Sequence, residues 1–392
     1  MPVCIIRNVR LLDKSESGTV TGDVAIRDGV IAEVLRGGAA LIRNEAADTE
    51  IDGGGGLLIP GMIDVHIHGA DGFDMMDGTA RSLEAVSAAC ARTGCTSFLA
   101  TSVSSSAEDL FGMLDSVARF IGNEAGARVA GVHIEGPYLN TKRKGMQNER
   151  YLRHPDLDEM KAILARAGSL IRMVTLAPEL PGGLEMVAYL KERGIVVSVA
   201  HSDATYEEAK QAFRSGASHV THCFNGMRPI HHRDPGVVVA AFEEPGVSVQ
   251  AIVDDVHLHP AIVRLLYREK GADRMVLITD ALQAMGMGDG SYLFGGHRVT
   301  VTDGVATLAD GTLASSTITM NAALAKAVQA GIPLRDAVRM ATETPAAVLG
   351  LTRKGRLAPG MDADLVLLDE RFEVQWTMVD GAVVYRRAES SR

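Results

Sequence analysis

The chain has 392 residues, and its formal net charge at pH 7 is −10. Such an acidic chain argues against nucleic-acid binding as the main function. Hydrophobic residues make up 46% of the chain and aromatic residues only 4%, which is typical of a globular protein whose core is packed by small side chains. This length fits one large α/β barrel with an appended domain.

Cysteine use and the N-terminal residues bear on the compartment. The four cysteines are Cys4, Cys90, Cys95 and Cys223, and they form no CxxC pair. Scattered cysteines are typical of reduced thiols in a cytosolic protein. The first residues lack the basic segment and apolar run of a signal peptide, and no run approaches the length of about eighteen apolar residues that a membrane span needs. We therefore expect a cytoplasmic protein without a membrane segment.

Both ends of the chain differ from its middle. Residues 1–56 contain short β-like runs separated by glycines, and residues 355–392 repeat this pattern. Such runs predict hairpins. We expect a small β-sandwich domain formed by both termini, 1–56 and 353–392, beside a barrel domain of residues 57–352.

Between these ends, short runs rich in Val, Ile and Leu alternate with amphipathic segments. The expected strands are 62–68, 95–101, 128–136, 171–177, 194–201, 219–225, 247–254 and 274–280. The expected helices are 81–94, 107–122, 182–194, 205–216 and 259–271, followed by helices near 318–350 that lead back to the terminal domain. Apolar strands are typical of a parallel sheet buried on both faces. Their alternation with helices predicts the fold class α/β, as a (β/α)8 TIM barrel.

Polar side chains stand where these strands end, on the face of a barrel that carries catalysis. In the first strand, Asp64, His66 and His68 share one face because side chains alternate along a strand. The other ionisable side chains are His133 and Glu135 on the third strand, His201 ending the fifth, His222 on the sixth and Asp280 ending the eighth. Burial of so many ionisable groups without a cation is costly, so the pattern predicts a metal site.

Imidazole and carboxylate ligands without a thiolate suit a divalent metal, one ion or two per subunit. Zn²⁺ is the first choice, with Fe²⁺, Co²⁺ and Mn²⁺ as alternatives. Asp280 is either another ligand, a structural acid or a general base; we favour a base that takes a proton from a water activated by the metal.

Two basic clusters lie near these strand ends. His231, His232 and Arg233 follow the sixth strand; they form either a solvated loop or a clamp, since a guanidinium there could bind a phosphate through two hydrogen bonds. Lys142, Arg143 and Lys144 are expected to belong to a solvated, mobile loop.

Several segments carry a family resemblance. They are PGMIDVHIHG (60–69), GVHIEGPYLN (131–140), AHSDATYEEA (200–209), THCFNGM (221–227), HHRDPGVV (231–238), DDVHLHP (254–260), LITDA (277–281), GTLASSTITM (311–320) and GRLAPGMDADLVLLD (355–369). With them the chain resembles the amidohydrolase superfamily and, within it, the family of N-acetylglucosamine-6-phosphate deacetylases. HIEGP, with its glutamate on the third strand, is the most specific of these motifs.

The resemblance implies roles for individual residues. Glu135, His201 and His222 would hold the main metal, while His66 and His68 would hold a second one bridged by Glu135. Asp280 matches the catalytic acid and base. The substrate-binding residues implied are Met146, Gln147, Asn225, Gly226, Arg233, Asp254, Asp255, His257, Leu313, Ala314 and Ser315. Arg233, with His257, would bind the phosphate, and in the family this arginine comes from the neighbouring subunit, which implies a homodimer.

The chain departs from the family at two positions. Where the family normally has Lys-Gly-Ala-His, this sequence has Lys144-Gly145-Met146-Gln147, so a neutral donor replaces a histidine. Loss of an oxyanion donor typically lowers the rate by roughly 10²–10³. Gly226 stands where the family usually has Ala. Both changes concern the substrate more than the chemistry.

The resemblance implies a metal-dependent deacetylase that converts N-acetylglucosamine 6-phosphate to glucosamine 6-phosphate and acetate. Two alternatives stay open. An amidohydrolase of the same fold would act on another N-acyl amino sugar or on an N-acyl amino acid. A catalytically silent homologue would serve as a binding protein, although the full set of ligands and Asp280 argues against it.

Overall fold

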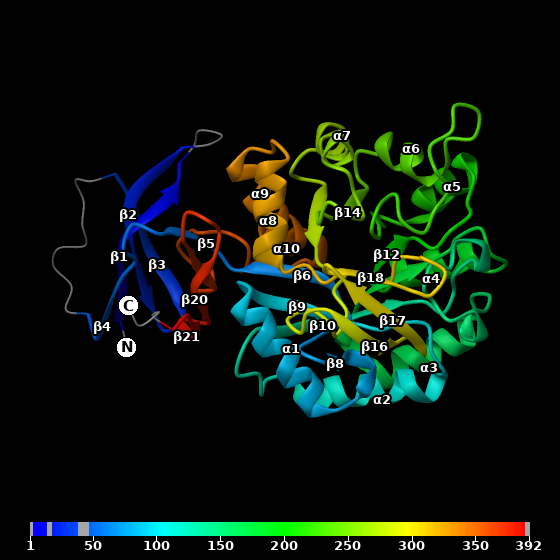
Figure 1. Cartoon of the computed structure of the whole chain (residues 1–392), viewed down its shortest axis with the longest axis horizontal. Coiled ribbons are helices and arrows are strands. Elements are labelled where there is room, and N and C mark those ends of the chain that lie inside the picture. The colour runs from blue at the N-terminus through cyan, green and yellow to red at the C-terminus, as the bar shows by residue number, and fades with distance from the viewer. Residues whose placement is uncertain (1–2, 14–17, 38–46, 389–392) are drawn as a thin grey trace.

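The computed structural model describes residues 3–13, 18–37 and 47–388. A barrel of strands and helices lies beside a smaller sheet to which both ends of the chain contribute (Figure 1). None of the helices in the described part of the chain combines the length and the apolar character that a membrane crossing requires.

Eight parallel strands form the barrel, and they follow one another around it in chain order. They are β6 (Met62–Ile67), β9 (Cys95–Thr101), β10 (Arg128–Glu135), β11 (Ile171–Leu176), β12 (Val196–Val199), β13 (His219–Val220), β14 (Ser248–Ile252) and β15 (Met275–Ile278). The first and last strands approach closely, since Asp280 N–H donates to the carbonyl of His66 at 2.8 Å. The predicted α/β fold with a TIM barrel is thereby confirmed.

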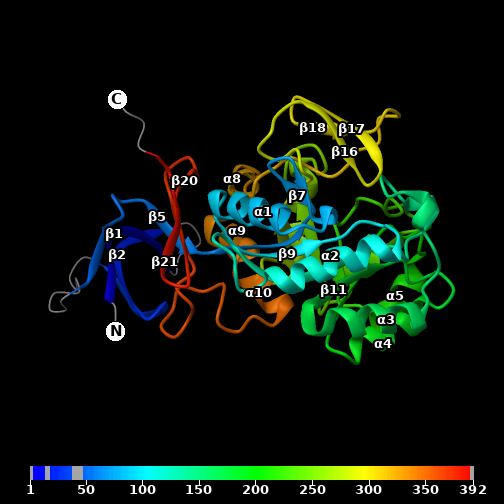
Figure 2. The ribbon, with the colours of Figure 1, turned by 90° about the horizontal axis from the view of Figure 1, so that it is seen from below.

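The strands are nearly all buried on both faces because helices cover the outside of the barrel (Figures 1 and 2). These helices are α1 (Ala80–Arg92), α2 (Ala107–Phe120), α3 (Leu157–Ala167), α4 (Gly183–Lys191), α5 (Tyr206–Ser215), α6 (Gly236–Phe242) and α7 (Pro260–Lys270). Three more, α8 (Met320–Gln329), α9 (Leu334–Ala341) and α10 (Glu343–Leu349), lead back toward the terminal sheet. The helices α3 and α6 were not predicted from the sequence.

Local sequence sets the limits of the helices, as α5 shows. The side chain of Thr205 accepts from the backbone N–H of Glu208, and the Glu208 side chain accepts in return from Thr205 N–H. Such a reciprocal cap satisfies donors that a helix start leaves free. The helix ends at Ser215, and Gly216 follows it with a φ of +128°, a conformation that suits glycine.

Both termini contribute to one sheet, ordered β21-β20-β19-β5-β1-β2-β3, with β4 paired to β1. Its strands are β1 (Val3–Leu12), β2 (Thr19–Arg27), β3 (Val30–Arg36), β4 (Thr49–Asp52), β5 (Leu57–Pro60), β19 (Leu365–Leu368), β20 (Val374–Val379) and β21 (Ala382–Arg386). The sheet has its own core, in which Leu11 and Ile26 join Leu365 and Trp376. β5 pairs with both β1 and β19, so it belongs to this sheet although it follows residue 56, where the terminal domain was expected to end. The boundaries of the two domains stay a prediction.

A second small sheet lies against the barrel and was not predicted. It contains β16 (Gly290–Phe294), β17 (His297–Thr302) and β18 (Val305–Thr307), and Figure 2 shows it at one edge of the molecule. A short pair, β7 (Gly69–Ala70) and β8 (Phe73–Asp74), follows β6. The ring of Phe294 packs against the ring of His68, with centroids 5.4 Å apart. These additions therefore border the end of the barrel where the strand-end histidines lie.

Candidate active site

Two groups of potential metal ligands lie at the carboxyl ends of the barrel strands. One contains His66 and His68 from β6 and Asp280, which follows β15. The other contains Glu135 at the end of β10 with His201 and His222, which follow β12 and β13. All six side chains are buried.

Glu135 joins the two groups. Its Oε1 atom lies 3.0 Å from His222 Nε2, 3.5 Å from His201 Nε2 and 3.6 Å from His66 Nε2. Its Oε2 atom lies 3.5 Å from His68 Nε2. Ligands bonded to one tetrahedral metal at about 2.0–2.1 Å stand about 3.3–3.4 Å apart, so these separations match the edges of coordination polyhedra.

The four histidines all direct Nε2 into the site, because an oxygen acceptor holds each Nδ1–H. His66 Nδ1–H donates to Gln250 Oε1 at 3.0 Å, and His68 Nδ1–H donates to the Thr101 carbonyl at 3.3 Å. His201 Nδ1–H donates to the Arg143 carbonyl at 2.8 Å, and His222 Nδ1–H donates to the Asn225 carbonyl at 3.1 Å. Such partners fix the tautomer and the ring orientation of metal-binding histidines. In its neutral form, each ring therefore offers a lone pair on Nε2.

The close approach of two histidine nitrogens favours a positive charge in the site. His66 Nε2 and His68 Nε2 lie only 3.1 Å apart, and two lone pairs at that distance repel each other unless a cation or a proton lies nearby. Burial lowers the pKa of His66, but the carboxylates of Asp280 and Glu135 outweigh it and raise this pKa to about 9. An imidazole and carboxylate set of this kind fits a divalent metal.

The pKa values of the two carboxylates shift downward, opposite to the shift of His66. Burial raises the pKa of Asp280, but His66 and His68 outweigh this effect and lower it to about 2. For Glu135, His66 and the other histidines likewise overcome burial and hold the pKa well below its usual range. Both acids are consequently charged near neutral pH.

Three of the six potential metal ligands have left-handed backbone conformations, with φ of 46° at His201, 29° at His222 and 49° at Asp280. The prediction that His222 lies within a strand was wrong, because β13 ends at Val220 and a turn follows. Similarly, β12 and β15 end before His201 and Asp280. Non-glycine residues with positive φ are uncommon and cluster at functional sites. Here the turns direct His201 and His222 toward Glu135 and Asp280 toward His66 and His68.

A cavity of about 230 Å³ opens beside these ligands. It is lined by Glu135, Gly145, Met146, Gln147, His201, His222, Asn225, Gly226, His257, Asp280, Thr312, Leu313 and Ser315. Most of the predicted substrate-binding residues are thus brought together. Gly145 and Thr312 were not predicted to line it, although Gly145 belongs to the segment 144–147 and Thr312 to the segment 311–320, both of which bear on the family resemblance.

Gln147 and Asn225 offer contrasting amides in this cavity. The side-chain oxygen Oε1 of Gln147 accepts from the backbone N–H of Ser104 at 2.8 Å, and its side-chain nitrogen Nε2 donates to Glu135 Oε2 at 2.8 Å. In the described part of the chain, the buried amide nitrogen of Asn225 has no hydrogen-bond partner. Asn225 therefore retains a donor for a bound molecule.

His257 lines the cavity, and Asp254 holds it. His257 Nδ1–H donates to Asp254 Oδ2 at 2.7 Å. Burial lowers the pKa of His257, but the Asp254 carboxylate outweighs it, so that this pKa lies above its ordinary value. A protonated His257 could attract an anion.

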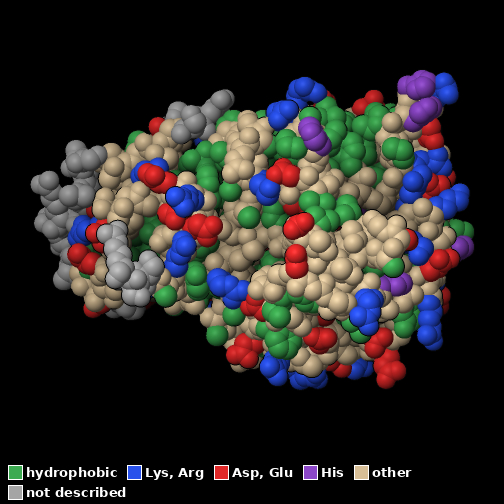
Figure 3. Space-filling model, in the orientation of Figure 1, with side chains coloured by type: hydrophobic (Ala, Val, Ile, Leu, Met, Phe, Trp, Pro, Cys, Tyr) green, Lys and Arg blue, Asp and Glu red, His purple; other side chains and the backbone are tan. Residues whose placement is uncertain are grey.

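The remaining predicted residues lie outside the cavity lining of the described chain. Asp255 is exposed and pairs with Lys326, whereas Ala314 is fully buried. Arg233 is exposed on the loop before α6, and its Nη1 lies 2.7 Å from His232 Nε2. Histidine and basic side chains gather at a protruding corner beside α5 and α6 (Figure 3). Within a single chain, Arg233 does not reach the cavity.

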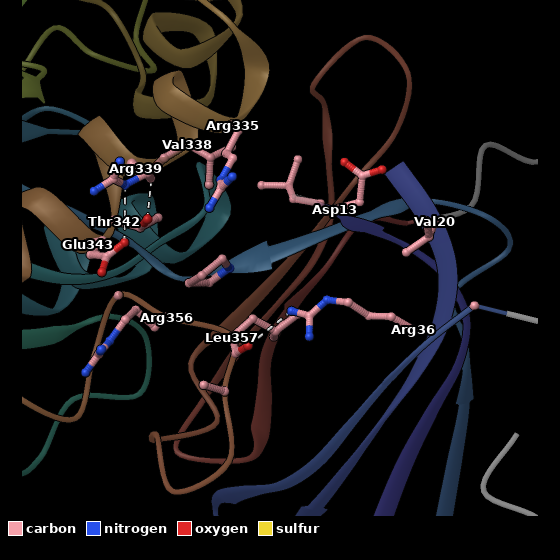
Figure 4. Close-up of a pocket in the computed structure, with 15 residues that line it drawn as sticks. Asp13, Val20, Arg36, Arg335, Val338, Arg339, Thr342, Glu343, Arg356 and Leu357 are labelled. Carbon is pink, nitrogen blue, oxygen red and sulfur yellow. Dashed lines mark hydrogen bonds and ion pairs between the residues drawn. The ribbon is translucent and has the colours of Figure 1, made fainter. Parts of the chain in front are cut away.

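A larger cavity, of about 560 Å³, lies between the terminal sheet and α9. Figure 4 shows Arg36 reaching from the sheet toward Leu357, opposite Arg335. Arg36 donates to the Leu357 carbonyl at 3.4 Å, and Arg339 is engaged by Glu343 at 3.3 Å. This cavity contains neither group of potential metal ligands, so the smaller cavity is the candidate active site.

The barrel and its two ligand groups define a class of metal-dependent hydrolases. A model of the amidohydrolase family matches residues 57–384, and the chain belongs to this family. Its membership and its donor set together assign a divalent metal to the site.

Individual relatives narrow the class. N-acetylglucosamine-6-phosphate deacetylase from Lysinibacillus sphaericus is 40% identical over 97% of each chain. N-acetylgalactosamine-6-phosphate deacetylase from Escherichia coli O157:H7 is 35% identical over 96% of this chain and 98% of its own. A mutant N-acetyl-D-glucosamine-6-phosphate deacetylase from Mycobacterium smegmatis, solved in complex with N-acetyl-D-glucosamine-6-phosphate, is similar with a TM-score of 0.89 and 35% identity, covering 98% of this chain and 99% of that chain.

Proposed function

We propose that the protein hydrolyses the N-acetyl group of N-acetylglucosamine 6-phosphate and releases acetate and glucosamine 6-phosphate. The observation that carries this proposal is the meeting of both ligand groups at Glu135, directly beside Asp280 and a cavity of about 230 Å³. Full-length relatives that bear this activity in their names support the choice of substrate.

Glu135, His201 and His222 would hold the main metal, and His66 and His68 would hold a second one that shares Glu135. We propose Zn²⁺, with Fe²⁺, Co²⁺ and Mn²⁺ as alternatives, because this donor set does not separate them. When bound, the metal supplies a Lewis acid that polarises the acetyl carbonyl and lowers the pKa of the attacking water.

The proton transfers belong to Asp280. Its carboxylate is ionised, and Ser315 Oγ donates to its Oδ1 atom at 3.2 Å. In the first step, Asp280 takes the proton of the attacking water. In the second step, it gives that proton to the amine nitrogen as the bond to the acetyl carbon breaks. Gln147 has a second amide hydrogen, which we assign to the carbonyl oxygen of the substrate.

The sugar and its phosphate would be bound by the outer part of the cavity. Asn225 and Gly226 contact the sugar phosphate, the former through its unpaired amide donor, and Met146, Leu313 and Ser315 line its other side. The raised pKa of His257 favours an anion.

Arg233 completes this phosphate site only if the neighbouring subunit of a homodimer supplies it. That arrangement agrees with its exposure on the loop before α6. A cytoplasmic location stays a prediction of the sequence.

A second candidate is the galactosamine isomer, because a relative named for N-acetylgalactosamine 6-phosphate is 35% identical over nearly the whole chain. The two isomers differ in one hydroxyl configuration, and a site that hydrogen-bonds a hydroxyl can reject the wrong arrangement by a large factor.

Comparison of kcat/KM for both phosphorylated isomers and for unphosphorylated N-acetylglucosamine tests the proposal. We expect the highest value for N-acetylglucosamine 6-phosphate and a marked loss without the phosphate. A preference for the galactosamine isomer would select the second candidate, and equal turnover of the unphosphorylated sugar would refute the phosphate site.

A further inference from the structure

Asp203 is a buried acid that no step above uses. It lies two residues after His201, and only 9% of its surface is exposed. Its Oδ1 atom accepts from Arg143 Nε at 2.9 Å, and its Oδ2 atom accepts from Arg228 Nη2 at 3.1 Å. Burial raises the pKa of Asp203, but the two arginines and Lys142, whose Nζ lies 3.4 Å from Oδ2, outweigh it and lower the pKa below its usual value. One carboxylate thus anchors two arginines from distant segments.

The first arginine belongs to the loop 140–147. The carbonyl of Arg143 accepts from His201 Nδ1–H at 2.8 Å, so the position of this residue orients a predicted metal ligand. The same loop continues to Met146 and Gln147, which line the cavity. The expectation of a solvated side chain was wrong for Arg143, which is partly buried and bound by Asp203.

The second arginine belongs to the loop 225–235. Arg228 Nε donates to the backbone carbonyl of Asp203 at 2.6 Å, and Arg228 Nη1 forms an ion pair with Asp234. Asn225 and Gly226 precede it in the cavity lining. Arg228 therefore secures both ends of the segment that carries Arg233.

Asp203 is itself held in place. Its backbone N–H donates to Glu179 Oε1 at 2.6 Å, and the adjacent Ser202 hydroxyl donates to Glu179 Oε2 at 2.7 Å. Glu179 also accepts from the Asn140 amide at 2.9 Å. The anchor is therefore fixed by a second acid that reaches the same loop.

We propose that Asp203 is a positioning residue with two separate effects: through Arg143 it orients His201 for metal binding, and through Arg228 it orders the substrate loop 225–235. The second effect rests on the proposed function, whereas the first depends only on the metal site. Partners that orient metal ligands typically change metal affinity or activity by about 10- to 100-fold when removed.

The test measures Zn²⁺ affinity by chelator competition, without substrate, beside the KM and kcat for N-acetylglucosamine 6-phosphate. Asp203→Asn should lower Zn²⁺ affinity by about 10- to 100-fold and raise KM, and Asp203→Glu should restore much of both because it keeps the charge. Asp115→Asn is the matched control, since Asp115 accepts from Arg166 at 2.8 Å on the outside of the barrel.

Single arginine variants separate the two effects. Arg143→Met should weaken Zn²⁺ binding more than Arg228→Met does, because the Arg143 carbonyl itself accepts from His201. Arg228→Met should raise KM more than Arg143→Met does, and it reaches the metal ligands only through the Asn225 carbonyl that holds His222. These side chains are partly exposed, 34% for Arg143 and 26% for Arg228, so both variants should fold even if Asp203→Asn does not. Equal effects of the two arginine variants on both readouts, or a Zn²⁺ affinity of Asp203→Asn equal to that of Asp115→Asn, would overturn the proposal. A wild-type protein inactive on this substrate would refute the proposed function alone.

Discussion

Asp280 shows how its neighbours set the role of one carboxylate. Burial alone would favour its neutral form, but His66 and His68 lower its pKa to about 2. Its positive φ of 49° turns the side chain out of the line of β15 and toward the ligands. Asp280 is therefore charged near neutral pH, which a group that takes a proton from water requires.

Replacement of this acid tests the assignment. Asp280→Asn keeps the shape of the side chain but cannot take a proton, so we expect kcat to fall by about 10²–10⁴-fold. Metal held by Glu135, His201 and His222 should remain. Steady-state kinetics with metal analysis of the same sample measure both; unchanged kcat would show that another group moves the proton.

The pair of Asp254 and His257 predicts a pH dependence. Burial lowers the pKa of His257, but Asp254 more than compensates and raises it above 6.5. His257 therefore carries charge at low pH and loses it as the pH rises through the raised pKa, so KM for the phosphorylated substrate should rise there.

Asp254→Asn removes the carboxylate that raises this pKa, and the rise in KM should consequently begin at a lower pH. His257→Gln should abolish the pH-dependent step. KM profiles between pH 5.5 and about 9 for both variants check this explanation, and an unshifted profile for Asp254→Asn would contradict it.

At the scale of secondary structure, the short strands allow the ligands to converge. β12 has four residues and β13 has two, and the turns after them place His201 and His222 over the barrel mouth. β10 is longer and brings Glu135 between the two ligand groups. One element therefore connects both halves of the metal centre.

This connection predicts unequal losses of metal. Glu135→Gln should lose more metal than the double variant His66→Asn with His68→Asn, because the Glu135 carboxylate contacts the Nε2 atoms of both groups. Metal content after dialysis against a metal-free buffer gives the comparison. Equal metal content in the two proteins would show that Glu135 does not bridge.

The sequence was most informative where periodicity is strong. Apolar runs predicted all eight barrel strands, and alternation along β6 predicted that His66 and His68 act together. The segment of α6, GVVVAAF, was missed because it has no polar face and its β-branched residues favour strands. β17 alternates buried and exposed residues and was open to prediction. The contacts of Asp203 could not be predicted from the sequence, because Arg143 and Arg228 lie far from Asp203 along the chain.

For the whole molecule, the position of Arg233 bears on whether one chain or two would be needed to form a complete phosphate site. Arg233 is exposed on the loop before α6 and absent from the cavity lining of its own chain. A homodimer that exchanges this arginine would complete the phosphate site with a group that is always charged.

Mixed dimers test this exchange. Asp280→Asn and Arg233→Ala should each be nearly inactive alone on the phosphorylated substrate. When the two are co-expressed, a mixed dimer should regain one working site, in which Asp280 of one subunit acts beside Arg233 of the partner subunit. Activity no higher than the sum of the separate variants would contradict exchange.

The most direct measurement is acetate release from N-acetylglucosamine 6-phosphate before chelator treatment, after it, and after Zn²⁺ is restored. Turnover that disappears with the metal and returns with it is the predicted result, since the ligand groups joined at Glu135 would then be the catalytic centre. Turnover that persists in metal-free protein, or its absence in the fully metallated protein, would contradict the assignment of a metal-dependent deacetylase.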